Sequence, residues 1–443
     1  MYARDLGWYR LFIVLPVLSV VLLSQYYWVV RVWRLARRIR QPVFRSVLRA
    51  ASILAFSIVL LTFVLNLSLG GSRAHWGVST VTALSGLWIA SALFGYMAVQ
   101  LVAAADWLLR APRLLAARLR RRQNGGTMQT ALTPSAAPPI NLARRRFVQT
   151  VSAVAGAIPF AAGAYGYAFE RLHFQLHRVD LPVNGLPPAL EGLRIAQLSD
   201  IHIGSYMSVS EVRRAVGMAN DLGSDLTVVT GDFLTAPGDP LEACIEELSH
   251  LRAPLGVWGC NGNHEAYSDA EALAAQLFRQ HGMGLLRQEN VEVVHDGQAF
   301  NLIGVDYQRE RPLWSRRPML GAIAHLVRRD VPNILLSHNP NSFRRAAELG
   351  IEVQLAGHTH GGQVRVEILD HRFSPAEFLT PYIAGLYQRP LGVWAALNDR
   401  EAWSGEPNGQ PSALYVNRGL GTIGAPIRLG VPPEITLLTL RRA

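Results

Sequence analysis

The sequence of 443 residues contains no lysine and only two cysteines, Cys244 and Cys260. Two cysteines are too few for a zinc-finger pattern or for the disulfide framework of a small secreted domain. We expect two small buried side chains; a single disulfide in an oxidising compartment is the alternative. The absence of lysine is typical of a codon-usage bias, and it predicts no function.

Acidic residues are scarce in the first 170 residues, which hold 3 of the 32 acidic residues but 19 of the 43 basic ones. A formal net charge of +11 often indicates nucleic-acid binding. Here the arginines flank apolar runs, which is typical of membrane orientation. We therefore predict the lipid bilayer as a partner and no nucleic acid.

Four stretches of the chain lack Asp, Glu and Arg altogether: residues 11–30, 50–72, 78–105 and 147–169. A helix needs about 20 apolar residues to cross the hydrocarbon core. The length and repetition of these stretches argue against buried helices of a soluble protein. We predict a region of about four transmembrane helices over residues 1–170, with basic cytoplasmic loops, and a second domain over residues 171–443.

The arginines between these stretches predict the orientation. Seven lie between the first and second stretches, nine between the third and fourth, and only Arg73 between the second and third. The positive-inside rule places the arginine-rich loops in the cytoplasm. The second domain is then extracytoplasmic, at the inner membrane of a bacterium. An error in the number of spans would reverse this side.

A short motif precedes the fourth stretch. The run Arg144-Arg145-Arg146-Phe147-Val148 resembles the twin-arginine export signal, in which two arginines precede a variable residue, Phe and an apolar residue. An ordinary arginine-flanked span is the alternative interpretation. The first interpretation adds the twin-arginine export machinery as a partner, and both place the following domain outside the cytoplasm.

Beyond residue 181, short apolar runs alternate with helix-like stretches. The predicted strands are residues 193–198, 226–230, 256–260, 291–294, 300–305, 333–336 and 351–355. The predicted helices are residues 209–222, 240–251, 269–281 and 340–349. This alternation predicts an α/β fold. Ligands of such folds bind beyond the carboxyl ends of the strands.

Five polar clusters follow these strands. Their candidate metal ligands are carboxylate, imidazole and amide groups: Asp200, His202, Asp232, Asn263, His338, His358 and His360. At the end of an extended strand, residues i and i+2 point to the same side, so Asp200 and His202 aim at one point. Without thiolates the set suits Mn²⁺, Fe, Zn²⁺ or Co²⁺ rather than a structural zinc. Seven ligands exceed the needs of one ion and are enough for two.

The clusters read D-x-H, G-D, G-N-H-E, a lone H and G-H-x-H in chain order. At these residues the sequence resembles the calcineurin-like metallophosphoesterases from about residue 193 to residue 440. The G-H-T-H-G-G-Q run at 357–363 and the tail at 415–422 and 432–435 narrow the resemblance. They resemble the membrane-associated or exported bacterial branch that is typified by YkuE-like and YaeI-like phosphoesterases.

The resemblance implies a four-layer α/β/β/α sandwich and a role for each matching residue. Asp200, His202 and His360 would hold the first metal, Asn263, His338 and His358 the second, and Asp232 would bridge them, with Mn²⁺ favoured. His264 would protonate or steady the leaving oxygen, and Asp232 and His264 would be the catalytic residues. Asn263 and Arg418 would contact the substrate, with an Arg418–carboxylate pair as the alternative. Glu265 and Tyr307 replace the Asp of many relatives.

We therefore predict hydrolysis of a phosphomonoester, phosphodiester or pyrophosphate, of an envelope or lipid-linked substrate, by two-metal activation of water. Two alternatives stay open. One is cleavage of the pyrophosphate of UDP-2,3-diacylglucosamine in lipid A synthesis, which is a cytoplasmic reaction. The other is a non-enzymatic scaffold or sensor with the same fold, although no ligand position is lost here.

Overall fold

The structure is a computed structural model, and it describes residues 7–69, 76–123, 142–308, 319–368, 371–378, 380–388 and 412–443. These residues fall into two compact units. One lies within Met1–Phe63 and Leu84–Ala164, and the other within Val64–Ala83 and Tyr165–Ala443. All β-strands of the described residues belong to the second unit.

The N-terminal part of the chain forms α1 (Gly7–Ala36), α2 (Pro42–Leu69), α3 (Trp76–Gln123) and α4 (Leu142–Tyr165). Three helical segments are long and apolar enough to cross a membrane: Pro42–Thr62, Leu84–Pro112 and Leu142–Glu170. They overlap the second, third and fourth predicted spans. The first predicted span lies in α1, which is not among the three candidates in the described part of the chain. The structure thus offers three candidate spans, where the sequence predicts about four.

Helices α1, α3 and α4 pack together through small and aromatic residues. The indole Nε1 of Trp28 in α1 donates to the carbonyl of Ala92 in α3 at 2.8 Å. A Cβ on Gly95 of α3 would lie 2.7 Å from the carbonyl oxygen of Gly156 in α4. Such close approach is how transmembrane helices associate without a hydrophobic driving force. The guanidinium of Arg144, the first arginine of the motif, donates to Asp106 of α3 at 2.9 Å.

The second unit contains two six-stranded mixed sheets. The first sheet has the order β1-β14-β2-β3-β4-β5. Its strands are β1 (Gln175–Val183), β14 (Glu434–Arg442), β2 (Arg194–Leu198), β3 (Leu226–Val229), β4 (Val257–Gly259) and β5 (Gly284–Leu285). Strands β2 to β5 are parallel, β14 runs antiparallel to β2, and β1 is parallel to β14.

The second sheet has the order β12-β13-β9-β8-β7-β6. Its strands are β12 (Gly385–Tyr387), β13 (Ala413–Val416), β9 (Val353–Ala356), β8 (Asn333–Leu336), β7 (Gln298–Gly304) and β6 (Glu289–His295). The four central strands are parallel, and both edge strands are antiparallel to their neighbours. A separate hairpin pairs β10 (Val366–Ile368) with β11 (His371–Phe373).

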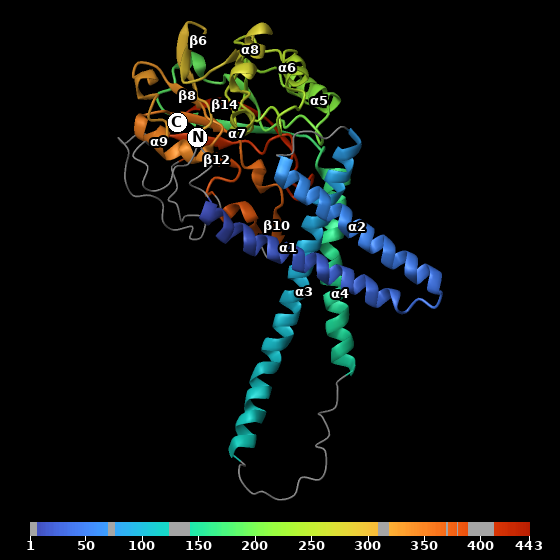
Figure 1. The fold of residues 1–443 in the computed structure, drawn as a ribbon. Helices are drawn as coiled ribbons and strands as arrows, with labels where there is room; N and C mark the ends of the chain where they lie inside the picture. Colours follow the sequence, from blue (N-terminus) through green and yellow to red (C-terminus); the bar gives the residue numbers. More distant parts are fainter. Residues whose placement is uncertain are drawn as a thin grey trace, which may run out of the picture. The chain divides into compact units, whose positions relative to one another are not determined.

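The remaining α-helices are α5 (Val209–Asn220), α6 (Leu241–Leu248), α7 (Asn263–Tyr267), α8 (Glu271–Gln280) and α9 (Phe343–Leu349). Helices α5, α6, α8 and α9 pack on the outer faces of the sheets, and α7 lies at the carboxyl end of β4. Short helices are η1 (Gly166–Glu170), η2 (Pro188–Leu190), η3 (Ala324–Leu326), η4 (Pro340–Ser342), η5 (His360–Gly362) and η6 (Pro375–Phe378). Helices α5, α6 and α8 lie side by side, and α9 lies on the opposite side of the unit (Figure 1).

Alternate residues of single strands belong to different hydrophobic clusters. Leu302 of β7 points into the core between the two sheets, and its neighbour Ile303 packs under α9. In β3, Val228 points into the same central core and Val229 packs under α5, α6 and α8. This period of two follows from the pleat of a strand. The layers therefore run helices, sheet, sheet, helix, and the predicted α/β fold is confirmed.

Every strand predicted from the sequence is present in the second unit, with small differences at its ends. The predicted helices appear as α5, α6, α8 and the η4–α9 segment. The sequence interpretation did not predict strands β1, β5, β10, β11, β12, β13 and β14. The parallel central strands of each sheet bring their carboxyl ends to one edge, and there the predicted polar clusters lie.

Candidate metal centre

The candidate ligands come from loops that follow parallel strands in both sheets. Asp200 and His202 follow β2, and Asp232 follows β3. In the second sheet, His338 follows β8 and the two histidines of the G-H-T-H run follow β9. The isolated bridge Ile203–Leu234 ties the loops after β2 and β3 side by side. Residues as distant in sequence as 200 and 360 thus meet at one place.

The backbone of these ligands adopts an unusual conformation. Five of them have positive φ: Asp200 (49°), His202 (51°), Asp232 (57°), His358 (77°) and His360 (52°). A non-glycine residue rarely adopts the left-handed region, because its Cβ crowds the backbone. Such residues persist where the surrounding structure holds them, and they cluster at functional sites. The conformation of the loops is therefore specified by this constellation and not by local preference.

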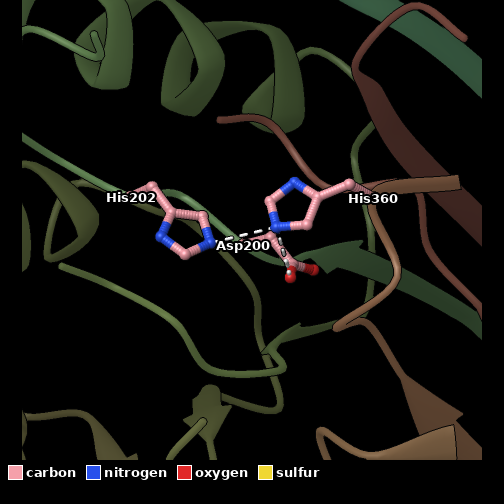
Figure 2. A group of neighbouring side chains, drawn as sticks. All are labelled: Asp200, His202 and His360. Atoms are coloured by element: carbon pink, nitrogen blue, oxygen red, sulfur yellow. Dashed lines mark hydrogen bonds and ion pairs between the residues drawn. The ribbon is translucent and has the colours of Figure 1, made fainter. Parts of the chain in front are cut away.

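One group of ligand atoms consists of Asp200, His202 and His360, whose side chains converge (Figure 2). The Nε2 atoms of His202 and His360 lie 3.1 Å apart. Nε2 of His360 lies 3.4 Å from Oδ1 of Asp200. Burial lowers the pKa of His202 to about 3 and that of His360 well below its usual value, so both rings are neutral. Two neutral imidazoles and one carboxylate facing a common point form a cation site.

A second group consists of Asp232, His338 and His358. Oδ2 of Asp232 lies 3.1 Å from Nε2 of His338 and 3.4 Å from Nε2 of His202 in the first group. Asp232 therefore lies between the two groups. Burial alone would lower the pKa of His338, but the neighbouring Asp232 carboxylate raises this pKa to about 10. The field at this position thus favours a positive charge.

Asn263 and His264 begin helix α7 beside these groups. Asn263 is 6% exposed, and its Oδ1 is buried without a hydrogen-bond donor among the described residues. A buried amide oxygen without a partner is costly unless it ligates something. Nδ1 of His264 lies 2.5 Å from the carbonyl oxygen of Thr235, which orients its ring. His264 also forms a ligand group with His202 and Asp232, with the three atoms within 4.8 Å of one another.

The donor chemistry therefore fits divalent metal ions. Imidazole nitrogens, carboxylate oxygens and one amide oxygen converge in a buried place without thiolates, as two neighbouring ions would require. Two glycines permit this convergence. A Cβ on Gly262 would overlap the carboxylate of Asp232, and a Cβ on Gly357 would overlap the carboxylate of Asp200. Only glycine lets these loops approach so closely.

Glu265 has a role that the sequence did not reveal. Its carboxylate is fully buried and accepts hydrogen bonds from the backbone N–H groups of Gly262 (2.7 Å), Asp232 (2.9 Å) and Phe233 (2.8 Å). It therefore ties the loop of Asp232 to the loop of Asn263. The ring of His264 is oriented by a different contact, the one with the Thr235 carbonyl.

The remaining predicted residues lie around the centre. Arg418 follows β13, and its Nε lies 3.1 Å from Oε2 of the buried Glu434. This is the carboxylate pair given above as the alternative to a substrate contact. The ring of Tyr307 lies 5.6 Å from that of His358, so an aromatic side chain lines the second group. Asp306 pairs with Arg287 at 3.0 Å instead of pointing at the ligands.

Comparison with known proteins places the chain in a family. Residues 193–362 match the calcineurin-like phosphoesterase family. The chain is 32% identical over 275 residues to the transmembrane protein with metallophosphoesterase domain of Bos taurus. This match covers 60% of this chain and 56% of the bovine protein. It is 27% identical over 307 residues to the uncharacterized metallophosphoesterase YkuE of Bacillus subtilis (strain 168), in a match that covers 68% of this chain and 98% of YkuE. It is also 27% identical over 307 residues to the phosphodiesterase YaeI of Escherichia coli (strain K12), in a match that covers 68% of this chain and 99% of YaeI.

The chain belongs to the calcineurin-like metallophosphoesterases, as the motifs indicated. This is a family of phosphoester hydrolases with a dinuclear centre of divalent ions, and the described residues contain ligand groups for such a centre. The matched region spans only about half of the bovine relative.

Proposed function

We propose that this protein is a membrane-anchored, metal-dependent phosphoesterase that hydrolyses a phosphomonoester, phosphodiester or pyrophosphate of an envelope or lipid-linked substrate. The observation that carries this proposal is the position of Asp232 between two groups of imidazole and carboxylate ligands. A carboxylate shared in this way is what a two-ion centre requires. Family membership and the similarity to a phosphodiesterase support the same reaction.

The proposed ligands divide into two sets. Asp200, His202 and His360 would hold one ion, and His338, His358 and Asn263 the other. Asp232 would bridge them. When bound, two divalent ions, with Mn²⁺ favoured, would supply a water nucleophile at neutral pH and offset charge on the phosphoryl oxygens.

His264 is the proposed general acid. The Thr235 carbonyl accepts a hydrogen bond from Nδ1–H of this ring. To act as general acid, the ring would carry a second proton on Nε2, give it to the leaving oxygen and become neutral. The ring stands edge-on to that of His202, with 4.6 Å between the ring centroids, which places it beside the ligand groups. Glu265 keeps the loops of Asp232 and His264 in register.

The proposed location is a bacterial inner membrane, with the hydrolase domain on the extracytoplasmic side. Three helical segments can span a bilayer by length and composition, and a relative is described as a transmembrane protein. Four spans, with α1 as the first, follow from the apolar run at residues 11–30 and from the arginine-rich loops. Paired alkaline phosphatase and green fluorescent protein fusions after Ala443 test the side. Activity of the phosphatase fusion is expected, and fluorescence alone would contradict the four-span topology.

The reaction is tested with the full chain in detergent micelles, stripped of metal and then supplied with Mn²⁺. Turnover of bis(p-nitrophenyl) phosphate and of p-nitrophenyl phosphate should depend on the metal, and the faster ester identifies the reaction class. Asp232→Asn should abolish turnover, since it removes the shared carboxylate. Asp221→Asn is the matched control, because Asp221 is exposed at the end of α5. Absence of turnover with Mn²⁺, Fe²⁺, Zn²⁺ or Co²⁺, despite two bound ions, would contradict hydrolysis of simple esters and favour the scaffold alternative.

A further inference from the structure

Arg428 is a buried arginine for which neither the motifs nor the proposed reaction has a use. It is 0% exposed, and its guanidinium makes six hydrogen bonds, all of them to backbone carbonyl groups. The acceptors are the carbonyl oxygens of His360, Arg418, Gly419, Gly421 (from both Nε and Nη2) and Val431. A planar guanidinium with five N–H donors is suited to holding several carbonyl groups at fixed positions.

These carbonyl groups belong to the backbone that surrounds one of the two ligand groups. In the turn after β13, the N–H of Leu420 donates to the backbone carbonyl of Ser199 at 3.0 Å, and the N–H of Gly421 donates to the backbone carbonyl of Asp200 at 2.7 Å. The carbonyl oxygen of Gly421 lies 3.3 Å from Nδ1 of His360. That contact places the proton of the ring on Nδ1 and leaves Nε2 for a metal. Arg428 thus fixes the loop of Arg418 to Gly421, and this loop fixes the backbone of Asp200 and the ring of His360.

The other ligand group is held by different contacts. Nδ1 of His338 lies 2.6 Å from the carbonyl oxygen of Thr230, and the loop of Asp232 is held by Glu265. Among the described residues, no hydrogen bond joins the Arg428 side chain to His338, to His358 or to the loop of Asp232. A change at Arg428 should therefore affect the two groups unequally.

The backbone of Arg428 is itself covered by the segment that follows α4. Gly166 is the first residue of η1, and a Cβ at this position would overlap the carbonyl oxygen of Arg428. Gly166 and Arg428 belong to the same compact unit. In the chain, η1 completes the candidate span Leu142–Glu170. The end of that span thus lies directly against the backbone that carries the buried guanidinium.

We propose that Arg428 is a positioning residue for the subsite formed by Asp200, His202 and His360, and that Gly166 seats the end of the membrane-spanning segment against it. The inference rests on the proposed two-ion centre and deepens it. The residues at the end of the span then belong to the support of the metal site. Residues that hold metal ligands from behind typically change metal affinity by about 10- to 100-fold when they are replaced.

The test is a Co²⁺ titration of the full chain in detergent micelles, followed by calorimetry and by visible absorption. Wild-type protein should bind two ions. Arg428→Lys keeps the charge but replaces the planar fork by a single ammonium, so one of the two ions should bind about 10- to 100-fold more weakly. Gly166→Ala should weaken the same ion, because the added Cβ displaces the Arg428 backbone.

Two matched controls separate positioning from general damage. Gly217→Ala adds a Cβ in α5 where no atom lies within 4 Å, and Arg213→Lys changes an arginine whose side chain is 70% exposed. Both controls should bind two ions as the wild type does. In a His358→Ala background, Arg428→Lys should weaken the remaining tight binding about 10- to 100-fold. In a His202→Ala background it should change the remaining affinity less than threefold.

Three results would overturn the inference. Unchanged affinity for both ions in the Arg428→Lys and Gly166→Ala variants would show that the contacts do not position the subsite. Equal weakening of both ions, with a lowered unfolding temperature, would show a purely structural role. Wild-type protein that binds no Co²⁺ would instead overturn the proposed metal centre, and with it this inference. If Arg428→Lys does not fold, Gly166→Ala carries the test alone.

Discussion

Glu265→Gln is the most informative single change outside the ligand set. The Oε2 atom of Glu265 accepts from the backbone N–H groups of Asp232 and Gly262, and Oε1 accepts from Phe233 and, at 3.4 Å, from Leu234. Glutamine is nearly the same size, but one of its terminal atoms is an NH₂ donor. Whichever way the amide turns, one pair of backbone N–H groups then faces a donor. The substitution therefore removes two hydrogen bonds without opening a cavity.

The expected cost follows from the number and type of these bonds. A hydrogen bond to a charged group contributes roughly 1.5–3 kcal/mol, so losing two would cost roughly 3–6 kcal/mol. The free energy of unfolding of a typical domain is about 5–15 kcal/mol, so the expected loss is a large part of it. Glu265→Asp keeps both acceptors and the charge but withdraws them by one methylene group. Its loss of stability should lie between that of the wild type and that of Glu265→Gln.

The assay is thermal unfolding of the full chain in detergent micelles, with and without Mn²⁺, together with metal analysis of the purified variants. Glu265→Gln should unfold at a lower temperature and retain less metal than Glu265→Asp, since the loops that carry Asp232 and Asn263 lose their common support. An unfolding temperature and a metal content equal to those of the wild type would refute the role assigned to Glu265.

Three further predictions rest on separate features. His264→Ala should retain two metal ions but lose turnover by about 10²- to 10⁴-fold, measured by metal analysis and initial rates; loss of an ion would make His264 a ligand instead. Gly95→Val should lower the unfolding temperature of the full chain, because the new side chain meets the Gly156 carbonyl, and overpacking costs about 1–3 kcal/mol; an unchanged temperature would contradict the close contact of α3 and α4. Burial raises the pKa of Glu352 above its ordinary 4.5, so its contribution to stability is present below that pH and is lost as the pH rises through the raised value. Glu352→Gln should therefore gain stability relative to the wild type between pH 4.5 and 7.5 in thermal unfolding, and a constant difference would contradict this.

Much of the fold was readable from the sequence because local patterns carried it. The strands at 226–229 and 333–336 are short apolar runs that end in turn residues, and they form where the pattern predicts them. Polar clusters after buried strands indicate a site in any parallel sheet, since the carboxyl ends share an edge. Strand β14 was missed, although its sequence EITLLTLRR is apolar, because no cluster of candidate ligands follows it.

The interpretation of the membrane region was less complete. The runs at 50–72, 78–105 and 147–169 overlap segments that qualify as spans, whereas α1 does not qualify in the described chain. Hydropathy and arginine placement concern one segment at a time, and the number of spans depends on all of them together. The close approach of Gly95 to Gly156 was not predictable, because it depends on which helices are neighbours.

The sequence by itself determined the chemistry of this protein: the residue types of the ligands, their order and their places at strand ends. Only the tertiary structure decided which ligands face one another, because Asp200 and His360 come from different sheets. It also decided the roles of Glu265 and Arg428. Their partners are backbone N–H and carbonyl groups, which every residue possesses, so a sequence does not show which of them a distant side chain will bind.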